Sequence, residues 1–271
     1  MAKGNDGNLL QHTCELAAMR AIIRAVSVKR FHLYCTHAMA PSEACETVPN
    51  PAGREQLTRA LNLAAAQNKA LPTGTKLRTS PLIDVLSRLN ASTASYPNTA
   101  RVLSNEAERL GVALSAVLVD TDADVEAALR ASFATPSVRV FRGDWRKPIA
   151  RFRSYDAPWL FTMDPDAFST RRTPGGIDSR DLRLVAEHVD RDLAAHLGVI
   201  TVFGYAMPQA TREAFWEAVV DAFGHHEVEF LAVAARSALK RHVAAVICAD
   251  KDVLTDVMVE AHDHLDTVDA I

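Results

Sequence analysis

The sequence predicts an α/β protein with a doubly wound, mostly parallel seven-stranded sheet, a helical insertion after the first strand and an antiparallel hairpin at the end. Three observations predict this fold class. Strand-like apolar runs alternate with helical segments in the second half of the chain. The first such run ends in a turn of small residues, within residues 31–41, as the first loop of an open α/β sheet does. The last two runs are too close together to be joined by a helix.

The composition is that of a packed globular protein without a strong charge bias. Of 271 residues, 48% are hydrophobic and 23% are charged, and the formal net charge is −3. We therefore expect one domain over residues 1–271, with residues 50–95 as the helical insertion within it. The charge balance gives no general signal for nucleic-acid binding, although a local basic patch is compatible with it.

Other features bear on location and on metals. The apolar runs are too short to span a bilayer and the N-terminus has no apolar signal core, so we expect a cytoplasmic protein without a membrane partner. The four cysteines have no C-x-x-C spacing, which favours reduced, packed thiols over metal ligands or disulfides. His225 and His226 are interpreted as a surface pair, and no metal site is expected.

The chain begins with a segment rich in glycine and asparagine, followed by a long helical pattern that ends at about Val26. Its apolar residues fall on one stripe of a 3.6-residue repeat. Asn8 and His12 lie one helical turn apart in this region. Two interpretations stay open: the pair faces a ligand, or the segment is an ordinary capped helix start.

The region after the first strand is predicted to be helical. Amphipathic patterns predict helices over residues 54–70 and 81–90, the second with proline in its first turn. No strand is predicted between Pro41 and Val112, which is too long a gap for an ordinary connection and indicates an insertion over the edge of the sheet. Residues 96–99 are interpreted as a turn before a helix over residues 99–110.

Strands and helices then alternate to the end of the sheet. The predicted strands cover residues 112–120, 137–144, 158–164, 198–205, 228–235 and 242–248, and the predicted helices cover residues 124–132, 178–197 and 209–222. The connection over residues 236–241 is too short for a crossover helix. The last two strands are therefore predicted to pair as an antiparallel hairpin.

Polar residues follow the first four strands of the predicted sheet. His37 follows the first strand, and Asp120, Asp144 and Asp164 end or follow the next three. Ligands of open parallel sheets collect at the carboxyl ends of strands. A carboxylate after the second strand suits the two hydroxyls of a ribose, and one after the third suits the amine of a purine. Each acid could alternatively cap a helix, as Asp120 could for the helix over residues 124–132.

Five short motifs resemble one family in their order along the chain. They are residues 4–12 (GNDGNLLQH), 35–38 (CTHA), 96–99 (YPNT), 142–144 (RGD) and 163–165 (MDP). They resemble the G-N-x-x-D-x-x-K-H, D-T-H-A-G-x-G, Y-P-G-S, G-D and D-P-P-Y motifs of bacterial large-subunit ribosomal RNA adenine-N6 methyltransferases, which are class I S-adenosylmethionine-dependent enzymes. The resemblance covers the first two thirds of the chain and implies the class I methyltransferase fold.

The resemblance also implies the cofactor and the site residues. S-adenosylmethionine would be bound by Asn8, His12, His37, Thr99, Asp120, Gly143 and Asp144. In this assignment Thr99 lies near the methionine end, Asp120 binds the ribose, and Gly143 with Asp144 binds the adenine. Asp164 and the carbonyl of Pro165 would orient the acceptor amine so that its lone pair faces the methyl group.

The sequence departs from the family motifs at several positions. Residues 39–41 (MAP) replace G-x-G, and Gln11 replaces the lysine before the histidine. Asp166 and Ala167 replace the second proline and the aromatic of D-P-P-Y, so the residue that would stack on an extruded base is missing there. Phe168, one position later, is the first candidate to replace it.

Two basic segments are candidates for contact with the substrate. Arg171 and Arg172 lie in a glycine- and proline-containing loop that could hold a phosphate or a carboxylate, or simply be solvated. Residues 145–159 mix basic and aromatic side chains, which suits nucleic-acid contact but is also common where aromatics belong to the core.

We therefore carry three functional hypotheses. The first is an S-adenosylmethionine-dependent methyltransferase that acts on the N6 amine of adenine in RNA or DNA. The second is a methyltransferase for the nitrogen or oxygen of a small molecule, which the missing stacking aromatic favours. The third is a non-catalytic descendant that binds the nucleotide. The chain is expected to be a monomer or a homodimer.

Overall fold

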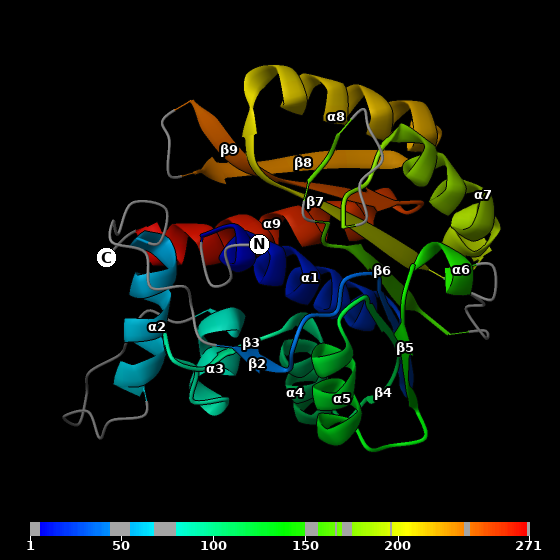
Figure 1. The fold of residues 1–271 in the computed structure, drawn as a ribbon. Helices are drawn as coiled ribbons and strands as arrows, with labels where there is room; N and C mark the ends of the chain where they lie inside the picture. Colours follow the sequence, from blue (N-terminus) through cyan, green and yellow to red (C-terminus); the bar gives the residue numbers. More distant parts are fainter. Residues whose placement is uncertain are drawn as a thin grey trace.

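The computed structural model describes residues 6–43, 55–67, 80–149, 157–165, 167–169, 175–195, 197–235 and 239–269. A seven-stranded sheet with the order β5-β4-β1-β6-β7-β9-β8 runs through the molecule (Figure 1). Its strands are β1 (Arg30–Cys35), β4 (Ala113–Asp120), β5 (Val138–Arg142), β6 (Trp159–Met163), β7 (Gly198–Pro208), β8 (Glu227–Ala234) and β9 (Lys240–Cys248). The neighbours from β5 to β7 are parallel, and β9 is antiparallel to β7 and β8. The predicted fold class is confirmed.

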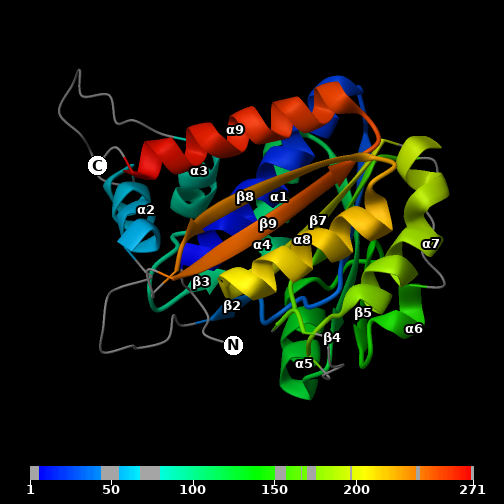
Figure 2. The ribbon, with the colours of Figure 1, turned by 90° about the horizontal axis from the view of Figure 1, so that it is seen from above.

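Helices cover both faces of this sheet (Figure 2). One face carries α1 (Asp6–Ala25), α4 (Thr99–Leu110), α5 (Ala123–Ser132) and α9 (Lys251–Asp269), and the other carries α6 (Arg146–Ile149), α7 (Ser179–Ala195) and α8 (Gln209–Phe223). Side chains of β1 alternate between the two cores, since Leu33 packs on the first and Tyr34 on the second. Three layers with two apolar cores follow from this pattern.

Capping residues mark both ends of α4 and the start of α5. Asn98 precedes α4 and accepts from the N–H of Arg101 at 3.0 Å, and Gly111 ends α4 in the left-handed conformation. Asp122 caps α5, because its carboxylate accepts from the N–H groups of Asp124 and Val125. The alternative prediction that Asp120 caps this helix is therefore wrong, because Asp120 is the last residue of β4 and Asp122 is the cap.

The insertion contains α2 (Glu55–Gln67) and α3 (Pro81–Arg88), which pack against each other and against α1. The carboxylate of Asp6 accepts from the N–H of Leu57 at 2.9 Å, so an acid at the start of α1 satisfies the first turn of α2. Both predicted helices are confirmed, as α2 and α3. That residues 50–95 form a subdomain stays a prediction.

A small ladder in this region was not predicted. β2 (Ser42–Glu43) pairs antiparallel with β3 (Tyr96–Pro97), whereas the sequence predicted no strand there and a turn over residues 96–99. Two-residue strands have too few side chains to give a periodic signal, and this pairing joins segments more than fifty positions apart. The ladder places Tyr96 and Asn98 beside the loop that follows β1.

The predicted C-terminal hairpin is confirmed, with Phe230 opposite Ala245 in β8 and β9. The helix α9 beyond it was not part of the prediction. It packs on α1, where Glu260 accepts from the guanidinium groups of Arg20 and Arg24 at 2.6 and 2.5 Å. Among the described helices, none has the length and apolar character needed to cross a membrane.

Candidate active site

The carboxyl ends of β5, β4, β1 and β6 meet along one edge of the sheet, which we call the rim. Asp120 ends β4, Asp144 lies two residues beyond β5, and Asp164 directly follows β6. The N–H of Gly143 donates to the carbonyl of Asp120 at 2.8 Å and ties the first two strand ends together. Asp120 and Asp144 therefore lie on the same side of the molecule, as expected, while their roles in binding stay predictions.

The loop after β1 is held in a fixed path over the rim. The N–H of Met39 donates to Oδ2 of Asp120 at 3.0 Å, and the Asn98 amide donates to the carbonyls of Ala38 and Met39 at 2.8 and 3.0 Å. Met39 has a φ of 56°, a left-handed conformation that favours glycine. Met39 therefore has a glycine-like backbone conformation at the position where the adenine-N6 methyltransferase motif that residues 35–38 resemble has glycine. Such strain is typical of functional loops.

A small pocket lies between this loop, α1 and the start of α4. It has about 20 Å³ of free volume, and its lining includes Asn8, His12, His37, Asn98 and Thr99. This is room for about one water molecule. Four of the predicted cofactor-binding residues are therefore brought together, whereas Asp120, Gly143 and Asp144 lie along the rim and do not line the pocket.

Two histidines of the pocket are neutral. The ring of His12 stacks on Tyr96, with its Nδ1 3.0 Å from the tyrosine hydroxyl, and burial lowers the pKa of His12 to about 3. The Nδ1 of His37 lies 2.7 Å from the Thr36 hydroxyl. Burial, and after it the charge of Arg146, lowers the pKa of His37 to about 4. Each ring can therefore offer one donor and one acceptor.

Arg146 organises the part of the rim that follows β5. Its guanidinium binds both carboxylate oxygens of Asp181 at 2.6 and 2.5 Å and also binds Asp144 at 3.0 Å. It lies 4.8 Å from the centre of the Trp145 ring. The buried Nε1 of Trp145 has no hydrogen-bond partner among the described residues. A charge-assisted bond from Arg146 therefore fixes the carboxylate of Asp144.

Beneath the pocket, polar side chains of α1 form a buried network around Gln11. The amide nitrogen of Gln11 donates to Glu15 at 3.1 Å and to Thr99 at 3.0 Å, and its amide oxygen accepts from the Tyr205 hydroxyl at 2.9 Å. A lysine could not accept that last bond. Gln11, which departs from the similar family, is therefore the centre of the network.

Glu15 is the acceptor at the end of this network. Its carboxylate accepts from the hydroxyls of Thr99 at 2.8 Å and Thr162 at 2.5 Å. Burial raises the pKa of Glu15 to about 8, the bonds from Thr162, Thr99 and Gln11 oppose this, and the charge of Asp164 adds to it. Glu15 is therefore protonated at neutral pH. The Thr99 hydroxyl, from a residue that lines the pocket, is engaged in bonds to both Gln11 and Glu15.

A bulge in β7 places Tyr205 at the rim. The register between β7 and β9 shifts between Gly204 and Met207, and Ala206 within the bulge has a φ of 46°. Bulges of this kind redirect side chains near functional sites. Burial raises the pKa of Tyr205 well above its usual value, and the neighbouring charge of Asp164 raises it further. Tyr205 is therefore a neutral hydroxyl that donates to Gln11 and lies near Asp164.

The close approach of α1 to this bulge gives a testable prediction at Gly7. A Cβ on Gly7 would lie 2.4 Å from Nδ1 of His242 and 2.5 Å from the Tyr205 ring. Alanine favours a helix over glycine by about 1 kcal/mol, so helix propensity alone predicts that Gly7→Ala is stabilising. We expect Gly7→Ala to be destabilising instead, with a loss of about 1–3 kcal/mol in the free energy of unfolding, because the rings of Tyr205 and His242 must move to make room for the methyl group.

Urea unfolding of the Gly7→Ala variant measures this sign. Ala21→Gly, at a buried position in the same helix, is the comparison that should follow helix propensity and lower stability. A Gly7→Ala variant as stable as the parent protein would mean that α1 and the bulge are not in contact.

Asp164 has the most enclosed position of the predicted catalytic residues. Its side chain is fully buried at the end of β6. Its charge contributes to the raised pKa values of three neighbours, Glu15, Tyr205 and Cys35. Elements far apart in the sequence (α1, β1, β6 and β7) thus converge on one carboxylate.

The remaining predicted residues lie elsewhere or outside the described chain. Pro165 is buried beside Asp164. Phe168 is packed edge-on against Phe215 at a ring distance of 5.3 Å, so stacking on a base would require it to move. Arg171 and Arg172 lie outside the described residues, and so does Asp166.

The sequence reasoning missed Glu15, Tyr205 and Arg146. A signal existed for Glu15, because a charged residue beside the apolar stripe of a buried helix, one turn after Gln11, indicates a buried polar role. Tyr205 gave no such signal, since its direction depends on the bulge. Arg146 was noted only as part of a basic segment, while its partner Asp181 is far along the chain.

Comparison with known proteins agrees with the fold. No protein-family model and no curated protein matches the sequence. Protein LPL1258 of Legionella pneumophila, described by the family model DUF519, has a TM-score of 0.62 at 14% identity, over 96% of this chain and 91% of that chain. This likeness covers nearly the whole of both chains and agrees with the α/β fold described above.

Two weaker matches, both with TM-scores below 0.5, are to enzymes. A TehB-like SAM-dependent methyltransferase from Corynebacterium glutamicum has a TM-score of 0.33 at 10% identity, over 86% of this chain and 88% of that chain. A spermidine synthase has a TM-score of 0.41 at 9% identity, over 94% of this chain and 63% of that chain. The description of the Legionella protein names no activity.

Proposed function

We propose that this chain binds S-adenosylmethionine along the rim and transfers its methyl group to the N6 amine of an adenine in nucleic acid. The observation that carries the proposal is the fully buried Asp164 at the end of β6, surrounded by the neutral side chains of Tyr205 and Glu15. The choice of adenine as acceptor rests on the motif resemblance of residues 163–165.

The donors and acceptors of the rim fit an adenosine-containing cofactor. Asp120 accepts one backbone N–H on each oxygen, which leaves a lone pair on each for the ribose hydroxyls. Asp144 is fixed by Arg146 and can accept from the adenine amine. The free volume of about 20 Å³ is too small for the cofactor, so the proposal requires the loop 38–41 to open.

The bound cofactor would supply the electrophilic methyl group on its sulfonium. Asp164 would accept a hydrogen bond from the acceptor amine and turn the nitrogen lone pair toward that methyl group. The bond from Tyr205 to Gln11 joins the bulge of β7 to α1 beside Asp164. A carboxylate at this position suits an amine donor and, after transfer, can accept the proton that the amine releases.

A second candidate is a protein that binds the nucleoside without methyl transfer. The small pocket and Ala167, which stands where the similar family has an aromatic, favour it. A methyltransferase that acts on a small molecule stays the third possibility, because it needs no stacking aromatic.

A transfer assay separates these candidates. The purified chain is incubated with methyl-labelled S-adenosylmethionine and an adenine-containing RNA, with the same RNA carrying N6-methyladenine as the matched control. We expect label in the first RNA only, and RNA binding that weakens steeply with salt. Cofactor binding by calorimetry without transfer to any RNA would favour the second candidate, and no cofactor binding would overturn the proposal.

The role of Asp120 gives a separate prediction. Asp120→Asn should weaken S-adenosylmethionine binding by about 1–3 kcal/mol, because two charge-assisted hydrogen bonds to the ribose lose their charge. Asp122→Asn, two residues away, changes an exposed helix cap and should leave the affinity unchanged. Calorimetric titration of both variants measures the difference. Equal affinities for Asp120→Asn and the parent protein would remove Asp120 from the site.

A further inference from the structure

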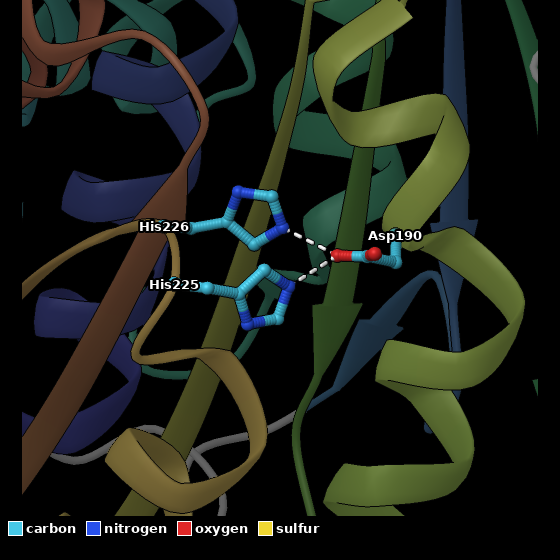
Figure 3. A group of neighbouring side chains, drawn as sticks. All are labelled: Asp190, His225 and His226. Atoms are coloured by element: carbon cyan, nitrogen blue, oxygen red, sulfur yellow. Dashed lines mark hydrogen bonds and ion pairs between the residues drawn. The ribbon is translucent and has the colours of Figure 1, made fainter.

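A cluster of metal-ligating side chains lies away from the rim, where the end of α7 faces the turn between α8 and β8 (Figure 3). The Nε2 atoms of His225 and His226 lie 2.6 and 2.5 Å from the same oxygen, Oδ1 of Asp190. A carboxylate only accepts, so each ring donates its Nε2–H to this oxygen. Two adjacent histidines thus aim the same nitrogen at one point.

The backbone around the histidines is held in place. The N–H of Gly224 donates to the carbonyl of Val220 at 2.7 Å, and the N–H of His226 donates to the carbonyl of Phe223 at 2.8 Å. A Cβ on Gly224 would lie 2.5 Å from that Val220 carbonyl, so the tight turn requires glycine. The side chain of His226 is 10% exposed and that of His225 is 55% exposed. One ligand is therefore fixed by packing and the other can adjust.

We infer that Asp190, His225 and His226 form a binding site for a divalent transition-metal ion of the zinc type. Two imidazole nitrogens and one carboxylate oxygen are a common three-residue ligand set for Zn²⁺, with a water molecule in the fourth position. Tetrahedral bonds of about 2.0–2.1 Å place ligand atoms about 3.3 Å apart. The observed distances are shorter, so the three side chains must separate by less than about 1 Å, which the exposed His225 and Asp190 allow.

The ion replaces the two Nε2 protons, which pass to solvent, and binds the carboxylate that they shared. It joins α7 to the α8–β8 turn, two elements that contact each other through the apolar core on the same face of the sheet. Its expected role is to stabilise this face. The sequence alone gave His225 and His226 only as a surface pair, because Asp190 is more than thirty positions earlier. This inference does not depend on the proposed methyl transfer.

Calorimetric titration of the chelator-treated chain (residues 1–271) with ZnCl₂ at pH 7.5 tests the site. We expect one tight zinc per chain and an increase in the melting temperature on zinc addition. His225→Ala and Asp190→Asn should each weaken zinc binding by about tenfold or more and remove the thermal shift. His262→Ala, which changes an exposed histidine on α9, is the matched control and should bind zinc like the parent protein.

A second measurement reports the ligand set itself. Cobalt(II) added to the parent protein should give the visible absorption of a tetrahedral site, and this signal should be absent in His226→Gln. Zinc binding of the parent protein that persists unchanged in His225→Ala and Asp190→Asn would overturn the site. Absence of stoichiometric binding by the parent protein would overturn it as well.

Discussion

Asp164→Asn is expected to lose about a hundredfold or more of the methyl-transfer rate while binding S-adenosylmethionine with nearly the affinity of the parent protein. The substitution keeps the shape of the side chain but removes its charge and replaces one acceptor oxygen by a donor. An amine acceptor then loses the group that orients its hydrogens in the transition state, an effect of about 2–4 kcal/mol for comparable oriented contacts. Single-turnover transfer and cofactor calorimetry on the same preparation measure both quantities.

Two further observations decide what a loss of activity in this variant means. The pKa of Glu15 should fall in this variant, because the neighbouring carboxylate that helps to raise it is gone. Tyr205→Phe is the graded comparison, since it removes only a hydroxyl that neighbours Asp164, and it should lose less activity. Full transfer by Asp164→Asn would exclude Asp164 as a catalytic residue. Loss of cofactor binding together with transfer would assign it to the pocket structure instead.

Glu15→Gln is expected to remove a fall in stability that the parent protein shows between about pH 6.5 and pH 8. The folded state holds the Glu15 proton up to about pH 8, whereas the unfolded chain releases it near the ordinary value of 4.5. Stability from this group is therefore complete below about pH 4.5 and is lost as the pH rises toward 8. Across the stated window the loss amounts to about 1–2 kcal/mol.

Below about pH 6.5, buried histidines change the stability in the opposite direction to Glu15. Burial lowers the pKa of His12 and His264 to about 3 and that of His37 and His242 to about 4. Their contribution grows as the pH rises from these values and is complete near pH 6.5, the ordinary value of the unfolded chain. Above this pH the effect of Glu15 stands alone among these buried groups.

Urea unfolding at several pH values, on the parent protein and on Glu15→Gln, measures the difference in slope. Glu187→Gln makes the same chemical change at an exposed position of α7 and should keep the slope of the parent protein. A parent protein whose stability is flat over this window would mean that Glu15 is ionised in the folded state, and that the buried network is arranged around two charges.

The predictions from the sequence succeeded where neighbouring residues along the chain carry the information. Helical and strand periodicity placed α1, α3, α4 and most of the sheet, and the short connection before β9 gave its antiparallel direction. They failed where two very short strands from distant parts of the sequence pair with each other, as β2 and β3 do. The motif comparison treated Gln11 only as a substitution, whereas its amide joins α1, α4 and β7 because it can donate and accept at once.

The sequence by itself determined the order along the chain of the seven long strands and of most helices, and the placement of Asp120, Asp144 and Asp164 at strand ends, because local patterning and chain connectivity decide both. Only the tertiary structure decided the left-handed turn at Met39, the direction of Tyr205, the proton on Glu15 and the meeting of Asp190 with two histidines. Each of these depends on burial or on contacts between distant segments. The free energy of such contacts appears only when the chain is packed, so no single stretch of sequence contains it.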